Sequence, residues 1–165
     1  MFGLKLHPRE QANGMTVIYD KLGVRLFYAE GWKITEDELS AEPRTLSVES
    51  PSGGTWELML YSEPRDSDEL AAEALSVMSE EYENLETSPY ATEFGDVQAS
   101  GYEIYFYHLD LLVHCRIVAA KFGEQTALLW WQAEDRDFDE LEPVFRAMAT
   151  TLLNPDKFPS PAPDG

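Results

Sequence analysis

The sequence predicts an α+β fold in which a central antiparallel β-sheet is flanked by helices on both faces, a three-layer α/β/α sandwich. The first observation is the segment Thr126 to Glu134 (TALLWWQAE), which is apolar at consecutive positions. Because neighbouring residues of a strand point to opposite faces, Trp130 and Trp131 are expected on opposite sides of the sheet. The second observation is a pair of segments with helical spacing of apolar residues, one well before this strand and one directly after it. We therefore expect a helix over each tryptophan.

Length and composition indicate one domain. The 165 residues, 44% of them hydrophobic, suffice for a single core. We divide the chain into an N-terminal segment (1–14), one domain (15–153) and a proline-rich C-terminal tail (154–165). The start of the chain has no apolar core of signal-peptide length, and no apolar run approaches the ~20 residues of a membrane span, so we expect a cytoplasmic location. Cys115 is the single cysteine, which excludes an intrachain disulfide.

The charge balance restricts the classes of partner. Twelve basic residues against 31 acidic ones give a formal charge of −19 and a pI near 4.3. Such a chain repels phosphate backbones and anionic lipid head groups, so we expect neither nucleic acid nor a membrane as partner. This negative charge is consistent with binding of a basic protein partner. It is equally explained by a need for solubility or by a salty habitat.

The strands are predicted from short apolar, β-branched and aromatic runs bounded by turn residues. Residues 36–43 are acidic and lack periodicity. The predicted strands are Met15–Tyr19, Val24–Tyr28, Thr45–Glu49, Thr55–Ser62, Val97–Tyr107, Val113–Phe122 and Thr126–Glu134.

The first helix is expected to begin at Asp66 or Ser67, where Asp66 and Glu69 resemble a capping box, and to end before Ser88-Pro89. Its apolar stripe is Ala71, Ala74, Leu75, Met78, Tyr82 and Leu85, and the opposite seam carries Glu69, Glu73, Glu80 and Glu83. Residues 66–86 contain no lysine or arginine. These four glutamates are therefore candidate partner-binding residues, although a solvated helix face explains them as well.

The second helix is expected over 137–153, because Phe138, Leu141, Phe145, Met148 and Leu152 follow helical spacing. Pro143 is expected in its first turns, where a missing N–H costs little. Asp137 and Asp139 supply favourable charge at the same end.

The order of these elements and several local strings resemble the PsbP-like α/β/α sandwich family, which also includes Mog-type nuclear import factors and bacterial domains of unknown function. The resemblance covers roughly residues 23–153. It is carried by Gly23-Val24-Arg25-Leu26-Phe27-Tyr28 followed by Gly31-Trp32, the acidic helix from Asp66, the aromatic strand Gly101 to Tyr107, and Gln132-Ala133-Glu134-Asp135. Ala29 stands where the family has proline, and Thr151-Leu152-Leu153 replaces its usual Ser-Phe ending.

The resemblance implies an antiparallel sheet flanked by helices and a role as a binding or assembly module without catalysis. It implies neither a particular partner nor a cofactor. One bacterial branch of the family looks like adaptor chaperones of secretion effectors.

The residues show no catalytic motif: G-x-S-x-G, Walker A, G-x-G-x-x-G, H-E-x-x-H and paired C-x-x-C are all absent from the sequence. His108, Asp110 and His114 surround one strand connection, which makes a metal or acid/base set conceivable, but a solvated hairpin tip is the stronger reading. We therefore expect no catalytic residues, no metal and no cofactor.

Two further candidates have structural explanations. Asp135, Asp137 and Asp139 have the spacing of the first ligands of a calcium-binding loop. Glu140, however, occupies the position where the turn needs glycine, and Arg146 the position where glutamate is expected. Helix capping explains these acids better. Cys115 is expected to be a small buried residue and not a nucleophile.

Tyr105 and Tyr107, with Trp32 and Trp56, are candidates for lining a peptide or ligand groove, although half-buried sheet aromatics are more common. Three functions remain, in this order: a non-catalytic protein-binding or adaptor module, a small-ligand carrier with a pocket beside the sheet, and a cryptic hydrolase that uses the histidines.

Overall fold

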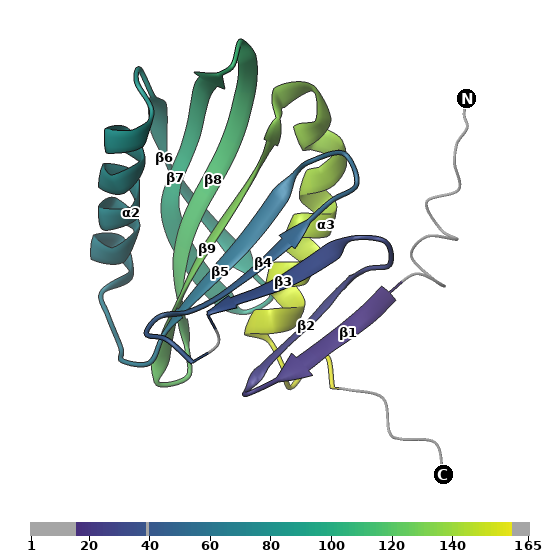
Figure 1. The fold of residues 1–165 in the computed structure, drawn as a ribbon. Helices are drawn as coiled ribbons and strands as arrows, with labels where there is room; N and C mark the ends of the chain where they lie inside the picture. The colour runs from purple at the N-terminus through teal and green to yellow at the C-terminus, as the bar shows by residue number, and fades with distance from the viewer. Residues whose placement is uncertain (1–15, 39, 160–165) are drawn as a thin grey trace.

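The structure is a computed structural model that describes residues 16–38 and 40–159 (Figure 1). The predicted N-terminal segment (1–14) and the end of the predicted tail (160–165) lie outside the described residues. The described strands are β1 (Thr16–Lys21), β2 (Val24–Ala29), β3 (Lys33–Glu38), β4 (Arg44–Glu49), β5 (Thr55–Tyr61), β6 (Glu86–Phe94), β7 (Val97–His108), β8 (Leu111–Phe122) and β9 (Gln125–Glu134). The described helices are α2 (Ser67–Glu81) and α3 (Asp135–Leu153).

Seven of these strands form one antiparallel sheet in the order β3-β4-β5-β9-β8-β7-β6, and β1 and β2 form a separate hairpin. The predicted tryptophan strand, β9, is the central strand. It pairs with β5 through Trp56 opposite Trp131 and with β8 through Ile117 opposite Trp130. Since three strands lie on each side of it, β9 is where the sheet is best protected from solvent.

The prediction of a three-layer α/β/α sandwich is wrong, because the fold is dominated by its strands. Strands account for about half of the described residues and two helices for about a quarter. The hairpin β1–β2 packs with α3, which lies on one face of the sheet, whereas α2 on the other face packs chiefly on β7 and β8 (Figure 1). A strand that is apolar on both faces shows only that each face is covered. It does not show that a helical layer does the covering.

The expectation that Trp130 and Trp131 lie on opposite faces of the sheet is confirmed. Trp131 is fully buried in the core on the α3 face, where its ring meets Phe94 edge-on at 6.0 Å between centroids. Trp130 is half-buried in the second core, with Met78 of α2. The alternation of side chains along β9 therefore supplies one large ring to each core.

The first helix begins as predicted and ends earlier than predicted. Asp66 is its N-cap, and the Asp66 side chain accepts a hydrogen bond from the backbone N–H of Glu69 at 3.0 Å. The helix ends at Glu81, and Asn84 takes a positive φ of 57° in the connection to β6. Pro89, expected to stop the helix, lies inside β6, an edge strand that tolerates a missing N–H.

The second helix begins at Asp135, directly after β9, so that Pro143 is not in its first turn but inside the helix. Proline at that position removes one helical hydrogen bond. The helix persists because Phe138, Phe145, Met148 and Leu152 are buried against the sheet.

Residues 154–159 stay close to the domain. The Asn154 amide donates a hydrogen bond to the carbonyl oxygen of Phe94 at 2.8 Å. The Arg25 guanidinium donates to the carbonyl oxygen of Pro155 at 2.7 Å, and the ring of Phe158 meets Phe27 edge-on. This stretch therefore connects the end of α3 to both β2 and the β6–β7 turn. Among the described residues, no helix has the length and apolar character that a membrane crossing requires.

Candidate functional site

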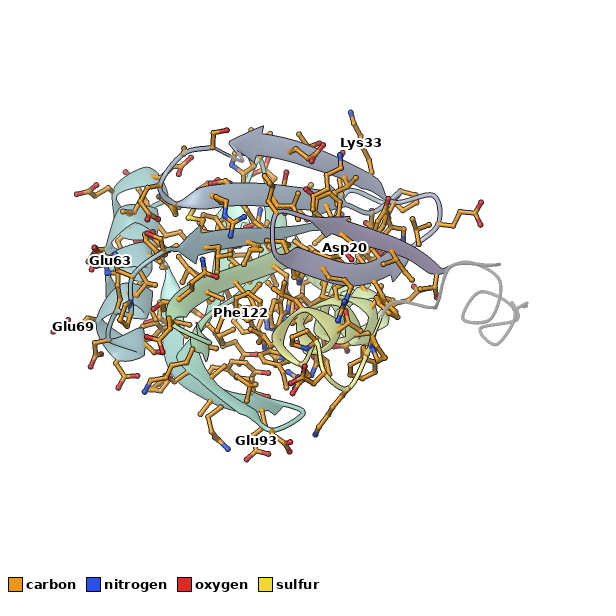
Figure 2. The ribbon with its side chains drawn as sticks, turned by 90° about the horizontal axis from the view of Figure 1, so that it is seen from below. Asp20, Lys33, Glu63, Glu69, Glu93 and Phe122 are labelled. Atoms are coloured by element: carbon orange, nitrogen blue, oxygen red, sulfur yellow. The ribbon has the colours of Figure 1, made fainter. Side chains whose placement is uncertain are left out.

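Three of the predicted partner-binding glutamates share the outer face of α2. At 3.6 residues per turn, Glu69, Glu73 and Glu80 lie within one narrow sector of the helix, and all three are exposed. Figure 2 shows Glu69 at the periphery of the molecule, directed away from the sheet. Arg65, just before the helix, forms an ion pair with Glu73. Glu83 is exposed but lies beyond the helix end, in the connection to β6.

The predicted tyrosines lie on the other face of the sheet, so the six predicted residues fall on two surfaces. Tyr105 is stacked on His114, with 4.2 Å between ring centroids. Tyr107 is 71% exposed near the tip of the β7–β8 hairpin. Trp56 is fully buried and Trp32 packs edge-on against Phe145, so both rings belong to the core on the α3 face. Trp32 and Trp56 are therefore core aromatics.

The histidines of the predicted metal or acid/base set point to opposite faces. His114 is 5% exposed and lies against Phe138 on the α3 face, whereas His108 is exposed and meets Tyr82 edge-on at 5.7 Å on the α2 face. Asp110 lies in the two-residue turn between β7 and β8, with a positive φ of 67°. The three side chains therefore do not converge. Within residues 16–38 and 40–159, no group of three or more metal-ligating side chains is arranged to hold an ion.

A cluster of charged side chains does converge, between β7, β8 and α3. The Arg116 guanidinium donates to Glu103 through Nη2 at 2.7 Å and through Nε at 3.1 Å, and it forms a second ion pair with Glu142 of α3. The His114 Nε2 atom lies 2.9 Å from the same Glu103 oxygen. The sequence does not reveal this cluster, because its members are dispersed over residues 103–142. The one local signal is the two-residue spacing of His114 and Arg116, which puts both on one face of β8.

The electrostatics of this cluster hold its charges in place. Burial by itself raises the pKa of Glu103, but hydrogen bonds from Arg116 and His114 outweigh it and leave the pKa below its ordinary value. Burial by itself lowers the pKa of Arg116. The hydrogen bond to Glu103 and the charge of Glu142 outweigh this effect and raise the pKa above its usual range. The cluster thus has the properties of a structural ion-pair network.

The other candidates take structural positions. Asp135 and Asp137 lie in the first turn of α3, where negative charge is favourable, and Asp139 is in the next turn. The Asp135 carboxylate is 3.9 Å from Nδ1 of His114. Cys115 is fully buried, and burial raises the pKa of its thiol well above the ordinary value, as expected for a core cysteine.

Two open depressions lie on the α2 face, beside β6. The larger, of about 610 Å³, is at the C-terminal end of α2, between Leu75 and Ser79 of the helix, Tyr82 and Glu83 after it, and Thr87 of β6. The smaller, of about 360 Å³, is at the N-terminal end of α2, between Asp68, Ala71, Pro89, Ala91 and Tyr102. Sequence reasoning missed both. The sequence does show several small residues in the segments that form α2 and β6. It does not show that these two segments lie side by side.

Comparisons with known proteins identify the fold and no family. No protein-family model matches the chain, and no curated protein matches it. Among solved structures, the chain is similar to that of cyanobacterial PsbP (CyanoP) from Synechocystis sp. PCC 6803, with a TM-score of 0.61 and 9% sequence identity over 91% of this chain and 94% of that one.

A second similar structure is that of a Pseudomonas aeruginosa protein of unknown function, with a TM-score of 0.47 and 13% identity over 92% of this chain and all of the other. At such identities a likeness concerns the backbone alone. The similarity to the cyanobacterial protein extends over nearly the whole length of both chains, and on that ground the chain has a PsbP-like fold.

Proposed function

We propose that this protein is a non-catalytic binding module, an adaptor or assembly factor, that contacts a basic protein partner through the outer face of α2. One observation carries the proposal: Glu69, Glu73 and Glu80 project together from an exposed helix face, and residues 66–86 contain no lysine or arginine. Arg65 is paired with Glu73, which leaves Glu69 and Glu80 available to a cation on a partner. Opposite charge on a partner would steer association along this face.

The architecture is consistent with this role. The charged cluster around Arg116 is engaged in ion pairs that connect β8 to α3, which supports a structural function for the titratable groups that do converge. The resemblance of the sequence to PsbP-like and Mog-type domains favours the same reading, because characterised members of that family are binding or assembly modules. Glu83 adds charge at the end of the helix, where the larger depression begins.

A small-ligand carrier is the second candidate, and one observation favours it. The larger depression, of about 610 Å³, falls within the range of roughly 300–1,000 Å³ that small-molecule sites occupy. A carrier buries most of its ligand, whereas this depression is open to solvent. A thermal-shift screen with small apolar and amphipathic compounds tests it, since a carried ligand raises the melting temperature as its concentration rises.

The experiment for the binding module uses charge removal without change of shape. Partners are captured on the immobilised protein, purified, and titrated against the wild type and against a variant with Glu69, Glu73 and Glu80 changed to glutamine, at several salt concentrations. A variant with Glu49, Glu93 and Glu124 changed to glutamine is the matched control, because these exposed acids lie on other elements. We expect weaker binding and a flatter salt dependence for the α2 variant only. Equal affinity and equal salt slope for both variants would contradict the proposal.

A further inference from the structure

We propose that the groove between α2 and β6 binds an extended, basic peptide segment of the partner, with side chains of that segment seated in the two depressions. The α2–β6 groove is formed by Ala71, Leu75 and Ser79 on the helix and by Thr87, Pro89 and Ala91 on the strand. This inference rests on the proposed function and deepens it, because it gives the partner a conformation as well as a charge.

The two depressions follow one another along α2 and β6. Leu75 lines the larger depression and Ala71 the smaller, and these residues are one turn apart on α2. Thr87 lines the larger and Pro89 the smaller, and these are neighbours on the same face of β6. From Thr87 to Ala91 the strand spans about 13 Å at roughly 3.3 Å per residue. An extended peptide of about five residues has the same length.

The groove exists because of the position of α2 and the size of the side chains around it. The helix packs on β7 and β8, so that the edge strand β6 lies beside the helix and not under it (Figure 1). Three of the residues that line the depressions are small: Ala71 and Ser79 on the helix and Ala91 on the strand. Gly101, which lines the smaller depression, carries no side chain, and a Cβ atom there would come within 1.8 Å of the carbonyl oxygen of Ile117 on the neighbouring strand β8.

The charge of the groove selects a basic occupant. Asp68 lines one end and Glu83 the other, and the helix that forms one wall has no basic residue along its length. The Asp68 carboxylate is held in position by a hydrogen bond from the Ser100 hydroxyl at 2.7 Å. Lysine or arginine side chains at both ends of an extended segment would meet these carboxylates, while shorter apolar side chains between them would enter the depressions.

The groove is better suited to side chains than to an added strand. Pro89 supplies no backbone N–H, and proline in an edge strand is one of the features that block regular pairing with another chain. We therefore expect the peptide to lie across the α2 side of the edge and not to extend the sheet. A second copy of this chain is a poor occupant, because its net charge of −19 repels this surface.

The test uses three fluorescent heptapeptides of the same length: Lys-Val-Lys-Val-Lys-Val-Lys, the same peptide with glycine for valine, and the same peptide with glutamate for lysine. Affinity is measured by anisotropy at physiological salt. The lysine–valine peptide is expected to bind at least about tenfold more tightly than the lysine–glycine peptide, because only valine has apolar side chains to bury in the depressions. The acidic peptide is expected not to bind.

Two groove-filling variants and one matched control locate the binding. Ser79→Trp and Ala91→Trp each fill one depression from an exposed position, and each is expected to weaken the lysine–valine peptide by about tenfold. Val77→Trp is the control: Val77 is 59% exposed and lies on nearly the opposite side of α2 from Ser79. It is expected to leave the affinity unchanged. The melting temperature of each variant is measured to verify that it folds.

The outcomes separate this inference from the proposed function. If Ser79→Trp and Ala91→Trp both bind the lysine–valine peptide like the wild type, or if the valine and glycine peptides bind equally, the groove is not the site. If the captured partner then binds less tightly to the variant with Glu69, Glu73 and Glu80 changed to glutamine, the acidic face of α2 is the contact and the proposed function stands. Absence of peptide binding overturns the inference, while partner capture still decides the proposed function independently.

Discussion

The imidazole ring of His114 lies against the phenyl ring of Phe138, with 3.6 Å between the ring centroids and 23° between the ring planes. The contact connects β8 to α3, and Tyr105 stacks on the other side of the histidine. His114 is thus a packed element of the interface between sheet and helix, in addition to its contact with Glu103.

Replacing His114 with alanine is expected to cost about 2 to 4 kcal/mol of unfolding free energy, because it opens a cavity between two rings and removes a polar partner of Glu103. Urea denaturation followed by tryptophan fluorescence measures it. His108→Ala is the matched control: His108 is exposed on the other face, and its replacement is expected to change stability by no more than about 0.5 kcal/mol. Equal losses in the two variants would contradict the packing role of His114.

The Glu103 carboxylate predicts a pH dependence of stability. Its pKa is below the ordinary value in the folded protein, since hydrogen bonds from Arg116 and His114 outweigh the effect of burial. A lowered folded-state pKa stabilises the protein above the unfolded-state pKa of about 4.3, and the stabilisation is lost as the pH falls through the folded-state value. Glu103→Gln is therefore expected to cost about 1.5 to 3 kcal/mol at pH 7.

The difference between the wild type and Glu103→Gln should shrink steadily below about pH 4, because protonation then removes the same charge from the wild type. Urea titrations between pH 3 and pH 7 provide the measurement. Glu49→Gln, on an exposed strand position, is the control for a general charge effect in so acidic a protein. A constant difference across this range would show that the charge of Glu103 is not responsible.

The two tryptophans of β9 are expected to differ in their contribution to stability. Trp131→Ala should cost about 3 to 5 kcal/mol, because Trp131 is fully buried on the α3 face. Trp130→Ala should cost less, because Trp130 is half-buried on the α2 face. Chemical denaturation of both variants checks the order. Equal or reversed costs would contradict the different burial of the two rings.

Cys115 is expected to be unreactive in the native protein. It is fully buried, and burial raises the pKa of its thiol, so that thiolate is scarce and inaccessible. A thiol reagent such as iodoacetamide should label it rapidly in denaturant and very slowly without. Fast labelling of the folded protein, at a rate close to that in denaturant, would refute this prediction.

Local physics explains which features were predictable from the sequence. The cap at Asp66, the β8–β9 hairpin and the opposite faces of Trp130 and Trp131 depend on residues near in the chain, through side-chain hydrogen bonding and the alternation of a strand. The burial of Cys115 follows from its place in an apolar run. Predictions failed where a local sequence pattern was compatible with more than one structure. Helical spacing extended to Leu85, yet the chain left the helix at Glu81 and entered β6.

The sequence by itself determined the strand that divides the domain into two cores, the start of the helix that carries the acidic face, and the strong negative charge. Only the tertiary structure decided what covers each face of the sheet, because burial requires a cover but does not specify a helix or a hairpin. The charged cluster around Arg116 and the α2–β6 groove also arise only in the tertiary structure. Glu103, Arg116 and Glu142 meet only because strand pairing and helix packing bring distant segments together. For the same reason Ser79 and Thr87 line one depression, and no spacing along the chain encodes this arrangement.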